Sequence, residues 1–506
     1  MKKICILFLS ICCCYNSIGQ QCRFEKSDGK ETATYFEAIA WYKHLDKISN
    51  NVLVKEMGMT DAGYPLHLVL ISNEGQFDAV KWHKQNKAVI LVINGIHPGE
   101  PDGIDASMML IRDIVSKKIK LPDNIALGFI PVYNIGGCLN RNSYSRANQN
   151  GPLEYGFRGN AQNLDLNRDF TKNDSKDARA FAQIFHLLDP DILIDNHVSD
   201  GADYQHTMTL ITTQFDKLGT GYLGKWLKES FEPQLYKSME EKKWGMVPYV
   251  NFETQNPDKG MEMFYDPPRY SSGYAALFQC IGFVPETHML KPYKDRVHST
   301  YAFMQTMIES SSANATELVA RRKLAKEAAM RQTSWPLSWR NDTIKYSLIT
   351  FKGYEQAFKP SDATGLNRMY YDRAKPFTQE VKFYNVFDPI NFITAPVAYI
   401  IPQGWHSVID LLRINNVIMK RFNNDTTIEV EAYRIDDYRS SSRPYEKHHK
   451  NSAVKTSVQK QKIRFLKGDY FIPMNQNANR YLIEMLEPTG DDSFFAWNFF
   501  DGILQQ

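Results

Sequence analysis

The feature that most constrains the fold is an uninterrupted apolar run followed closely by a histidine and a glutamate. Residues 88–93 read Ala-Val-Ile-Leu-Val-Ile, a mostly β-branched run that is typical of a strand buried on both faces of a sheet. Pro101 then suits the first turn of a helix. Apolar residues recur beyond it with helical spacing, at Ile104, Met108, Ile111 and Val115. The sequence therefore predicts a strand–turn–helix unit with His97 and Glu100 in its turn.

Such a turn lies at the edge of a sheet, where α/β proteins tend to build their sites. An imidazole and a carboxylate three residues apart can both face one ion. Zinc accepts nitrogen and oxygen ligands, and a catalytic zinc needs three protein ligands and one open position. Taken alone, His97 and Glu100 fit a polar turn that caps a helix equally well. A zinc site therefore requires a third ligand from elsewhere in the chain.

Strands and helices alternate over the first part of the chain. Thr34 and Glu37 have the spacing of a capping box, which opens a helix. Further strands are expected at 52–57, 66–71, 125–133, 192–195 and 280–284, and helices at 177–188 and 297–309. This alternation predicts a doubly wound α/β domain, which we place at residues 30–312.

The composition changes twice beyond this domain. Residues 315–331 are rich in Ala, Leu, Lys, Arg and Glu, which predicts a helix within a linker at 313–334. Strand-like runs separated by Pro, Asn and Gly then predict a smaller β-rich domain at 335–506. Its aromatic end could bind sugar or peptide, but packing in the core or against the first domain explains it better: Phe494, Phe495, Trp497, Phe499 and Phe500.

The first residues have the form of a secretory signal. Lys2 and Lys3 precede an apolar stretch too short to span a bilayer, and small residues near Gly19 suit cleavage before Gln20. We therefore expect a signal peptide at 1–19 and a secreted or periplasmic protein without a membrane span. The formal net charge of +3 falls to about +1 without this segment, so nothing favours nucleic acid.

Three cysteines remain after the signal: Cys22, Cys138 and Cys280. Their wide spacing excludes a cysteine-rich zinc module or a disulfide framework. One disulfide among them is compatible with the sequence, and the spacing does not indicate its pairing.

A second buried strand supplies the third ligand. Residues 192–195 read Ile-Leu-Ile-Asp, and His197 follows this run closely. A single histidine at a strand end is commonly structural. Beside the turn of His97 and Glu100, however, it completes a set of three donors for zinc.

Four more polar residues fit the same geometry. Metal-bound histidines usually donate their other N–H to a carboxylate, and Asp165 could accept it from the first histidine. Asn167 and Arg168 offer an amide and a planar guanidinium suited to holding a carboxylate. Glu286, at the end of a later buried strand, is placed to act as a general base. A surface ion pair or an exposed strand-end acid is the ordinary alternative for each.

These residues occur along the chain in a fixed order: His97-x-x-Glu100, Asp165-x-Asn167-Arg168, His197 and Glu286. In this order, over roughly residues 30–310, the sequence resembles the zinc carboxypeptidases of the carboxypeptidase A kind. Residues 134–137, Asn-Ile-Gly-Gly, also resemble that family's Asn-Pro-Asp-Gly turn at two positions. Among relatives, the resemblance is closer to secreted bacterial members with an added C-terminal domain.

The resemblance implies an α/β/α sandwich around a mixed, largely parallel sheet, with one zinc ion per chain. It further implies that Asp165 holds a metal-bound histidine and that Asn167 and Arg168 hold the terminal carboxylate of a peptide. Glu286 would be the general base. The implied metal ligands are His97, Glu100 and His197.

Three positions depart from the family pattern or stay open. The arginine that polarises the scissile carbonyl is either Arg146 or Arg158, and the shorter spacing of Arg158 from Arg168 favours it, as in aspartoacylase-type relatives. His288 lies beside the expected base, and it would either tune the pKa of Glu286 or pack against neighbouring side chains. The mobile tyrosine over the substrate has three candidates: Tyr265, Tyr270 and Tyr274.

The sequence therefore predicts a secreted zinc exopeptidase that acts on peptides with a free C-terminus. An alternative is a zinc amidase or deacylase acting on cell-wall peptides or N-acyl amino acids, which the spacing of Arg158 and the export signal motivate. A second alternative is a binding protein with a vestigial site. The preferred terminal side chain and the oligomeric state have no signal in the sequence.

Overall fold

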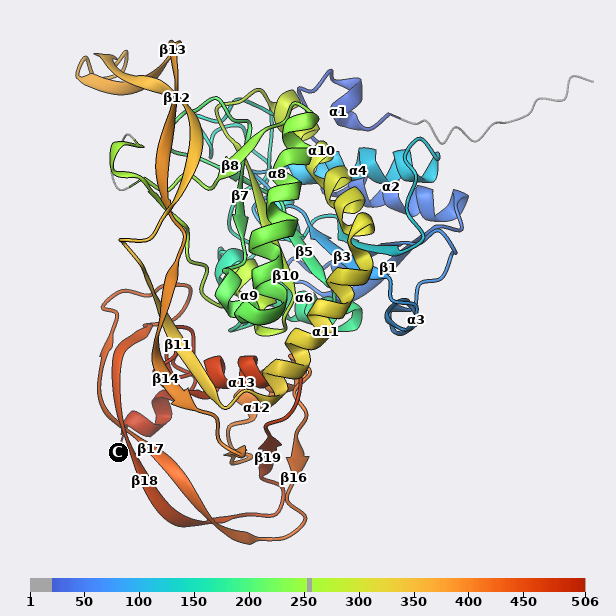
Figure 1. The fold of residues 1–506 in the computed structure, drawn as a ribbon. Coiled ribbons are helices and arrows are strands. Elements are labelled where there is room, and N and C mark those ends of the chain that lie inside the picture. The colour runs from blue at the N-terminus through green and yellow to red at the C-terminus, as the bar shows by residue number, and fades with distance from the viewer. Residues whose placement is uncertain (1–20, 253–256, 506) are drawn as a thin grey trace, which may run out of the picture.

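A computed structural model describes residues 21–252 and 257–505 of the chain (Figure 1). The expected signal peptide at 1–19 lies outside the described residues. Among the residues that are described, no helix is long and apolar enough to cross a membrane.

The centre of the molecule is a mixed sheet with the order β1-β2-β4-β3-β5-β10-β7-β8, and β6 also pairs with β10. The pairs around β3 and β5 are parallel, whereas both edges contain antiparallel pairs. The strands are β1 (Val52–Met59), β2 (Pro65–Ile71), β3 (Ala88–Ile93), β4 (Ile125–Ile130), β5 (Ile192–Asp195), β6 (His197–Ser199), β7 (Met208–Thr212), β8 (Met246–Pro248) and β10 (Ile281–His288).

Helices cover both faces of this sheet. Successive residues of β3 belong alternately to two apolar cores, one on each face. Ile90 and Val92 belong to one apolar core, and Val89 and Leu91 belong to the other. The first core is closed by α2 (Tyr35–Ile48), α4 (Asp102–Val115), α8 (Glu232–Glu241) and α10 (Tyr293–Ala313). The second is closed by α3 (Ala79–Lys84), α6 (Lys176–Leu188) and α9 (Ser271–Leu277). The predicted α/β/α sandwich is confirmed.

The C-terminal part is rich in strands that form separate small sheets, as predicted. The paired strands are β11 (Ser334–Asn341) with β14 (Phe387–Thr394), β12 (Ser347–Pro360) with β13 (Asn367–Tyr384), and β17 (Thr426–Ser440) with β18 (Asn451–Phe465). A fourth small sheet holds β15 (Ala398–Ile401), β19 (Tyr470–Pro473) and β16 (Lys420–Arg421), and β9 (Met261–Glu262) pairs with β13.

This part also shares the second core of the central sheet. Helices α12 (His406–Ile414) and α13 (Asn479–Leu486) contribute apolar residues to it, and α11 (Ala315–Arg331) leads the chain from the sheet to the small sheets (Figure 1). Phe494, Phe495 and Trp497 are buried, so the aromatic end packs as core. The division of the chain at residue 335 stays a prediction.

The helices and strands have the types that the sequence predicts, but some of their lengths differ from the prediction. Thr34 and Glu37 form the capping box at the start of α2. The expected strand at 280–284 is longer, so Glu286 lies within β10 and not beyond its end. Cys22, Cys138 and Cys280 are all buried and unpaired, so these three cysteines form no disulfide with one another.

Candidate active site

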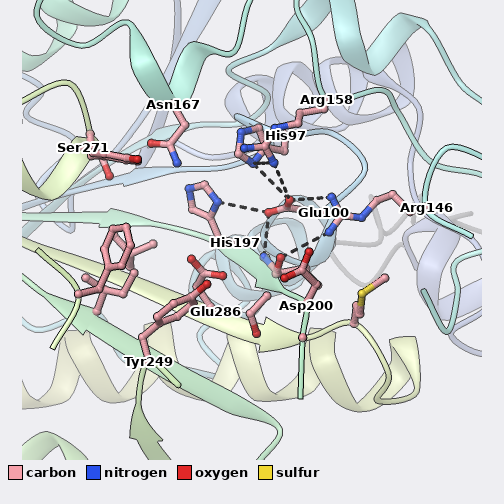
Figure 2. A pocket seen from close by; sticks show the side chains of 18 of the residues that line it. His97, Glu100, Arg146, Arg158, Asn167, His197, Asp200, Tyr249, Ser271 and Glu286 are labelled. Atoms are coloured by element: carbon pink, nitrogen blue, oxygen red, sulfur yellow. Dashed lines mark hydrogen bonds and ion pairs between the residues drawn. The ribbon is translucent and has the colours of Figure 1, made fainter. Parts of the chain in front are cut away.

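Two neighbouring strands bring the three expected metal ligands together. His97 and Glu100 lie in the turn between β3 and α4, and His197 opens β6 directly after β5. Because β3 and β5 are parallel neighbours, their carboxyl ends meet at the same edge of the sheet. One donor atom of each residue lies within 4.8 Å of the others, and all three side chains are buried (Figure 2).

The two imidazoles present the same nitrogen to the carboxylate. Nδ1 of His97 is 3.2 Å from Oε1 of Glu100, and Nδ1 of His197 is 3.3 Å from Oε2. Nε2 of His97 is 3.0 Å from Oδ1 of Asp165, and Nε2 of His197 is 3.0 Å from Oδ2 of Asp195. Asp165 thus orients His97 from behind through a hydrogen bond, the arrangement that favours metal binding through the opposite nitrogen, and Asp195 lies at ion-pair distance behind His197.

The electrostatics of the site also suit a divalent cation. Burial would lower the pKa of His197, but the charges of Asp195 and Glu100 raise it well above its usual value. Burial would raise the pKa of Asp165, and the hydrogen bond to His97 and the nearby arginines lower it instead. Two nitrogens and a carboxylate, buried and backed by further carboxylates, form a donor set that fits zinc.

Asp195 was missed as a site residue by the sequence reasoning. It precedes His197 by two positions at the end of a buried strand, where a carboxylate is unexpected. This position in the sequence could have identified Asp195, because a histidine that binds a metal usually has a carboxylate behind it.

Glu286 faces the three expected metal ligands from the adjacent strand. It pairs in register with His197, and its side chain lines a cavity of about 770 Å³ that also contains His97 and Glu100. Burial raises the pKa of Glu286 to about 8, and the charge of Glu100 adds to this rise, whereas that of His197 opposes it. A cation held by the three ligands would also lower this pKa. Glu286 is therefore placed to exchange a proton inside the cavity.

Both candidate arginines line the same cavity. Nη1 of Arg146 is 2.7 Å from Oε1 of Glu100. Arg158 donates from Nε and Nη2 to Oδ2 of Asp165, at 3.1 and 2.8 Å, and its Nη1 is 3.3 Å from Nδ1 of His97. Asn134 fixes this loop by donating to the backbone oxygen of Arg158.

Asn167 and Arg168 lie in a short 3₁₀ turn, Leu166–Arg168, at the wall of the cavity. Oδ1 of Asp165 accepts a hydrogen bond from the backbone N–H of Asn167 and so fixes the turn. The guanidinium of Arg168 lies over the ring of Tyr270, 4.4 Å from its centroid. The predicted substrate-binding pair therefore borders the same cavity as the expected metal ligands.

The structure separates the three tyrosine candidates. Tyr270 lines the cavity. Tyr274 is buried elsewhere and donates to Oδ1 of Asn415, and Tyr265 lies over Lys217. Tyr249, which the sequence reasoning missed, lines the cavity from β8's end (Figure 2). No local pattern distinguishes Tyr249 from the other tyrosines.

His288 packs and does not face the cavity. Its ring lies 4.6 Å from that of Tyr204 in an edge-to-face arrangement, and burial lowers its pKa to about 4. The rest of the cavity lining includes polar residues that the sequence did not single out: Ser145, Ser199, Asp200, Asp266 and Ser271.

Comparison with known proteins supports the resemblance seen in the sequence. The sequence profile of the zinc carboxypeptidase family matches residues 38–185. Carboxypeptidase 2 of Trichophyton rubrum is 22% identical over 422 residues, which cover 80% of this chain and 72% of that protein.

The solved structures to which the chain shows some similarity include two carboxypeptidases. A metallo-carboxypeptidase from Burkholderia cenocepacia is 14% identical, with a TM-score of 0.41 over 56% of this chain and 70% of that one. Carboxypeptidase A from Helicoverpa armigera is 16% identical, with a TM-score of 0.42 over 57% of this chain and 75% of that one. The family profile matches the segment that holds His97, Glu100, Asp165 and Arg168, and the chain is similar to the zinc carboxypeptidases over this segment.

Proposed function

We propose that this enzyme releases the C-terminal residue of peptides, with one zinc ion per chain held by His97, Glu100 and His197. The proposal rests on the set of side chains that line one cavity. A metal-ligating triad, a carboxylate facing it and an arginine suited to a free carboxylate all line the same space.

Zinc, when bound, supplies a Lewis acid that polarises a carbonyl oxygen and lowers the pKa of water. Glu286 accepts the proton of the attacking water and returns it to the nitrogen of the departing amino acid. Burial raises its pKa above that of an exposed carboxyl group, which suits a group that must both take and give a proton. Arg158, beside His97, polarises the carbonyl of the bond to be cleaved.

Arg168 and Asn167 select the end of the chain. A guanidinium binds a carboxylate through two parallel charge-assisted hydrogen bonds, whereas an amidated end offers no charge. Their position beside the triad restricts cleavage to the last peptide bond. We further propose, from the form of residues 1–19, that the enzyme works outside the cytoplasm.

The test combines metal analysis with two variants. We expect the purified protein to hold one equivalent of zinc, and Glu286→Gln to keep the zinc but lose turnover. Arg168→Ala should lose about tenfold or more in kcat/KM on peptides with a free C-terminus, which corresponds to a lost charged hydrogen bond of about 1.5–3 kcal/mol.

Amidated versions of the same peptides are the control, and Arg168→Ala should leave their slow hydrolysis unchanged. A protein without stoichiometric zinc would support the vestigial alternative. Equal effects of Arg168→Ala on free and amidated peptides would show that this residue does not bind the terminal carboxylate.

A further inference from the structure

We infer that the C-terminal part of the chain supplies a positioning element for the active site, namely the hairpin end formed by residues 441–450. Its tyrosine, Tyr445, holds the guanidinium of Arg168 in the orientation that receives a carboxylate. The inference deepens the proposed function and rests on it, because it takes Arg168 as the residue that binds the substrate's terminus.

The hairpin end touches the active-site loop at two adjacent points. Nε of Arg168 donates to the hydroxyl oxygen of Tyr445 at 3.0 Å. The backbone N–H of Asp165 donates to Oε2 of Glu446 at 2.9 Å. One residue therefore contacts the carboxylate-binding arginine, and the next contacts the backbone of the residue that orients His97.

The hairpin end is built as a rigid turn. Tyr445 and His448 exchange two backbone hydrogen bonds, of 2.8 and 3.1 Å, across a two-residue turn. Both turn residues, Glu446 and Lys447, have positive φ values of 49° and 72°, the type I′ pattern that usually takes Asn and Gly. Such backbone costs free energy in residues with a side chain, so the surrounding contacts must stabilise it.

Two contacts from other elements fix the turn in place. Nε2 of His448 lies 2.8 Å from Oδ2 of Asp174, in the segment before α6. The ring of Tyr445 stacks on that of Trp497, with centroids 6.0 Å apart and planes 18° from parallel. Because Trp497 is fully buried, the tyrosine is held against a fixed surface.

The remaining N–H groups of Arg168 are suited to binding a carboxylate. Its guanidinium carries five N–H groups, of which Nε–H is held by Tyr445 and one on Nη1 by the backbone oxygen of Asn167. The ring of Tyr270 covers one face. The hydrogens left are on the two terminal nitrogens, which form the fork that binds both oxygens of a carboxylate. Tyr445 thus fixes the direction of this fork.

The experiment measures kcat and KM of the zinc-loaded, full-length enzyme on one peptide with a free C-terminus. Tyr445→Phe removes the hydroxyl and keeps the stacked ring. We expect KM to rise about tenfold, the loss of one hydrogen bond to a charged group, with kcat within about twofold of the parent. Tyr445→Ala, which also removes the ring, should raise KM further.

The matched control is Tyr438→Phe on the same hairpin, where the ring contacts Phe495 and lies on β17. This change should leave both kinetic constants unchanged. Adding Tyr445→Phe to Arg168→Ala should change KM by less than about twofold, because the tyrosine acts through the arginine.

Three results would overturn the inference. Parental KM in Tyr445→Phe, with Arg168→Ala impaired, would refute the role of the hairpin and leave the proposed function standing. A lower KM would mean that Tyr445 competes with the substrate for Arg168. An Arg168→Ala enzyme with parental KM would overturn both the inference and the assignment of Arg168.

Discussion

The carboxylate of Asp165 connects the proposed metal site to the proposed substrate site, and replacing it by an amide tests that connection. Oδ1 accepts from the backbone N–H of Asn167 at 2.9 Å and lies 3.0 Å from Nε2 of His97, while Oδ2 accepts two hydrogen bonds from Arg158. Asparagine has one acceptor oxygen and one NH₂ group. In either orientation, Asp165→Asn therefore turns an NH₂ group towards a donor.

We expect Asp165→Asn to weaken zinc binding by about 10- to 100-fold, since losing the carboxylate behind a metal-bound histidine has effects of this size. This corresponds to about 1.4–2.7 kcal/mol. The assay is competition for zinc with a chelator of known affinity. Asp437→Asn, which removes an exposed ion pair with Lys455, is the control and should bind zinc as the parent does.

A variant that folds normally and binds zinc within about twofold of the parent would refute the reasoning. It would mean that the orientation of His97 is fixed by packing of its ring and not by its hydrogen bond to Asp165. Loss of folding in the variant is detected separately by the melting temperature, measured after zinc has been removed from both proteins.

Four further predictions concern stability. Chelation of zinc should lower the melting temperature, because a ligand present at a hundred times its Kd stabilises by about 2.7 kcal/mol; an unchanged value would indicate an empty site. Trp497→Ala should cost about 3–5 kcal/mol of unfolding free energy in a denaturant titration, as for other buried aromatic residues. Arg322→Met leaves the buried Asp191 without its cation and should cost about 3–5 kcal/mol in the same titration. Burial would raise the pKa of Asp189, but Arg322 and Lys326 lower it, so its stabilisation is present above about pH 4 and is lost as the pH falls further. Asp189→Asn should therefore be less stable at pH 7 and lose less stability on acidification; equal pH profiles would contradict this pairing.

The central sheet could be predicted from the sequence because burial leaves a direct pattern. Residues 88–93 and 192–194 are apolar without interruption, as strands covered on both faces must be. The helix ends were less certain: α10 extends from Tyr293 to Ala313, beyond the expected 297–309. The lengths of the strands β17 and β18 could not be predicted, because one of their faces is exposed and carries many polar residues.

The sequence by itself determined the chemistry of the proposed metal site. Two histidines and a glutamate, each at the end of a buried strand, have donor atoms suited to zinc wherever the chain places them, and parallel strands bring their ends to one edge. Their meeting therefore followed from local patterns together with the resemblance.

Only the tertiary structure decided which residues complete the cavity. Tyr249 lines it and Tyr274 does not, although both are tyrosines before Glu286. The contact of Tyr445 with Arg168 joins residues 277 positions apart. Such contacts depend on how separate elements pack against one another, and this packing leaves no periodic signal in either segment.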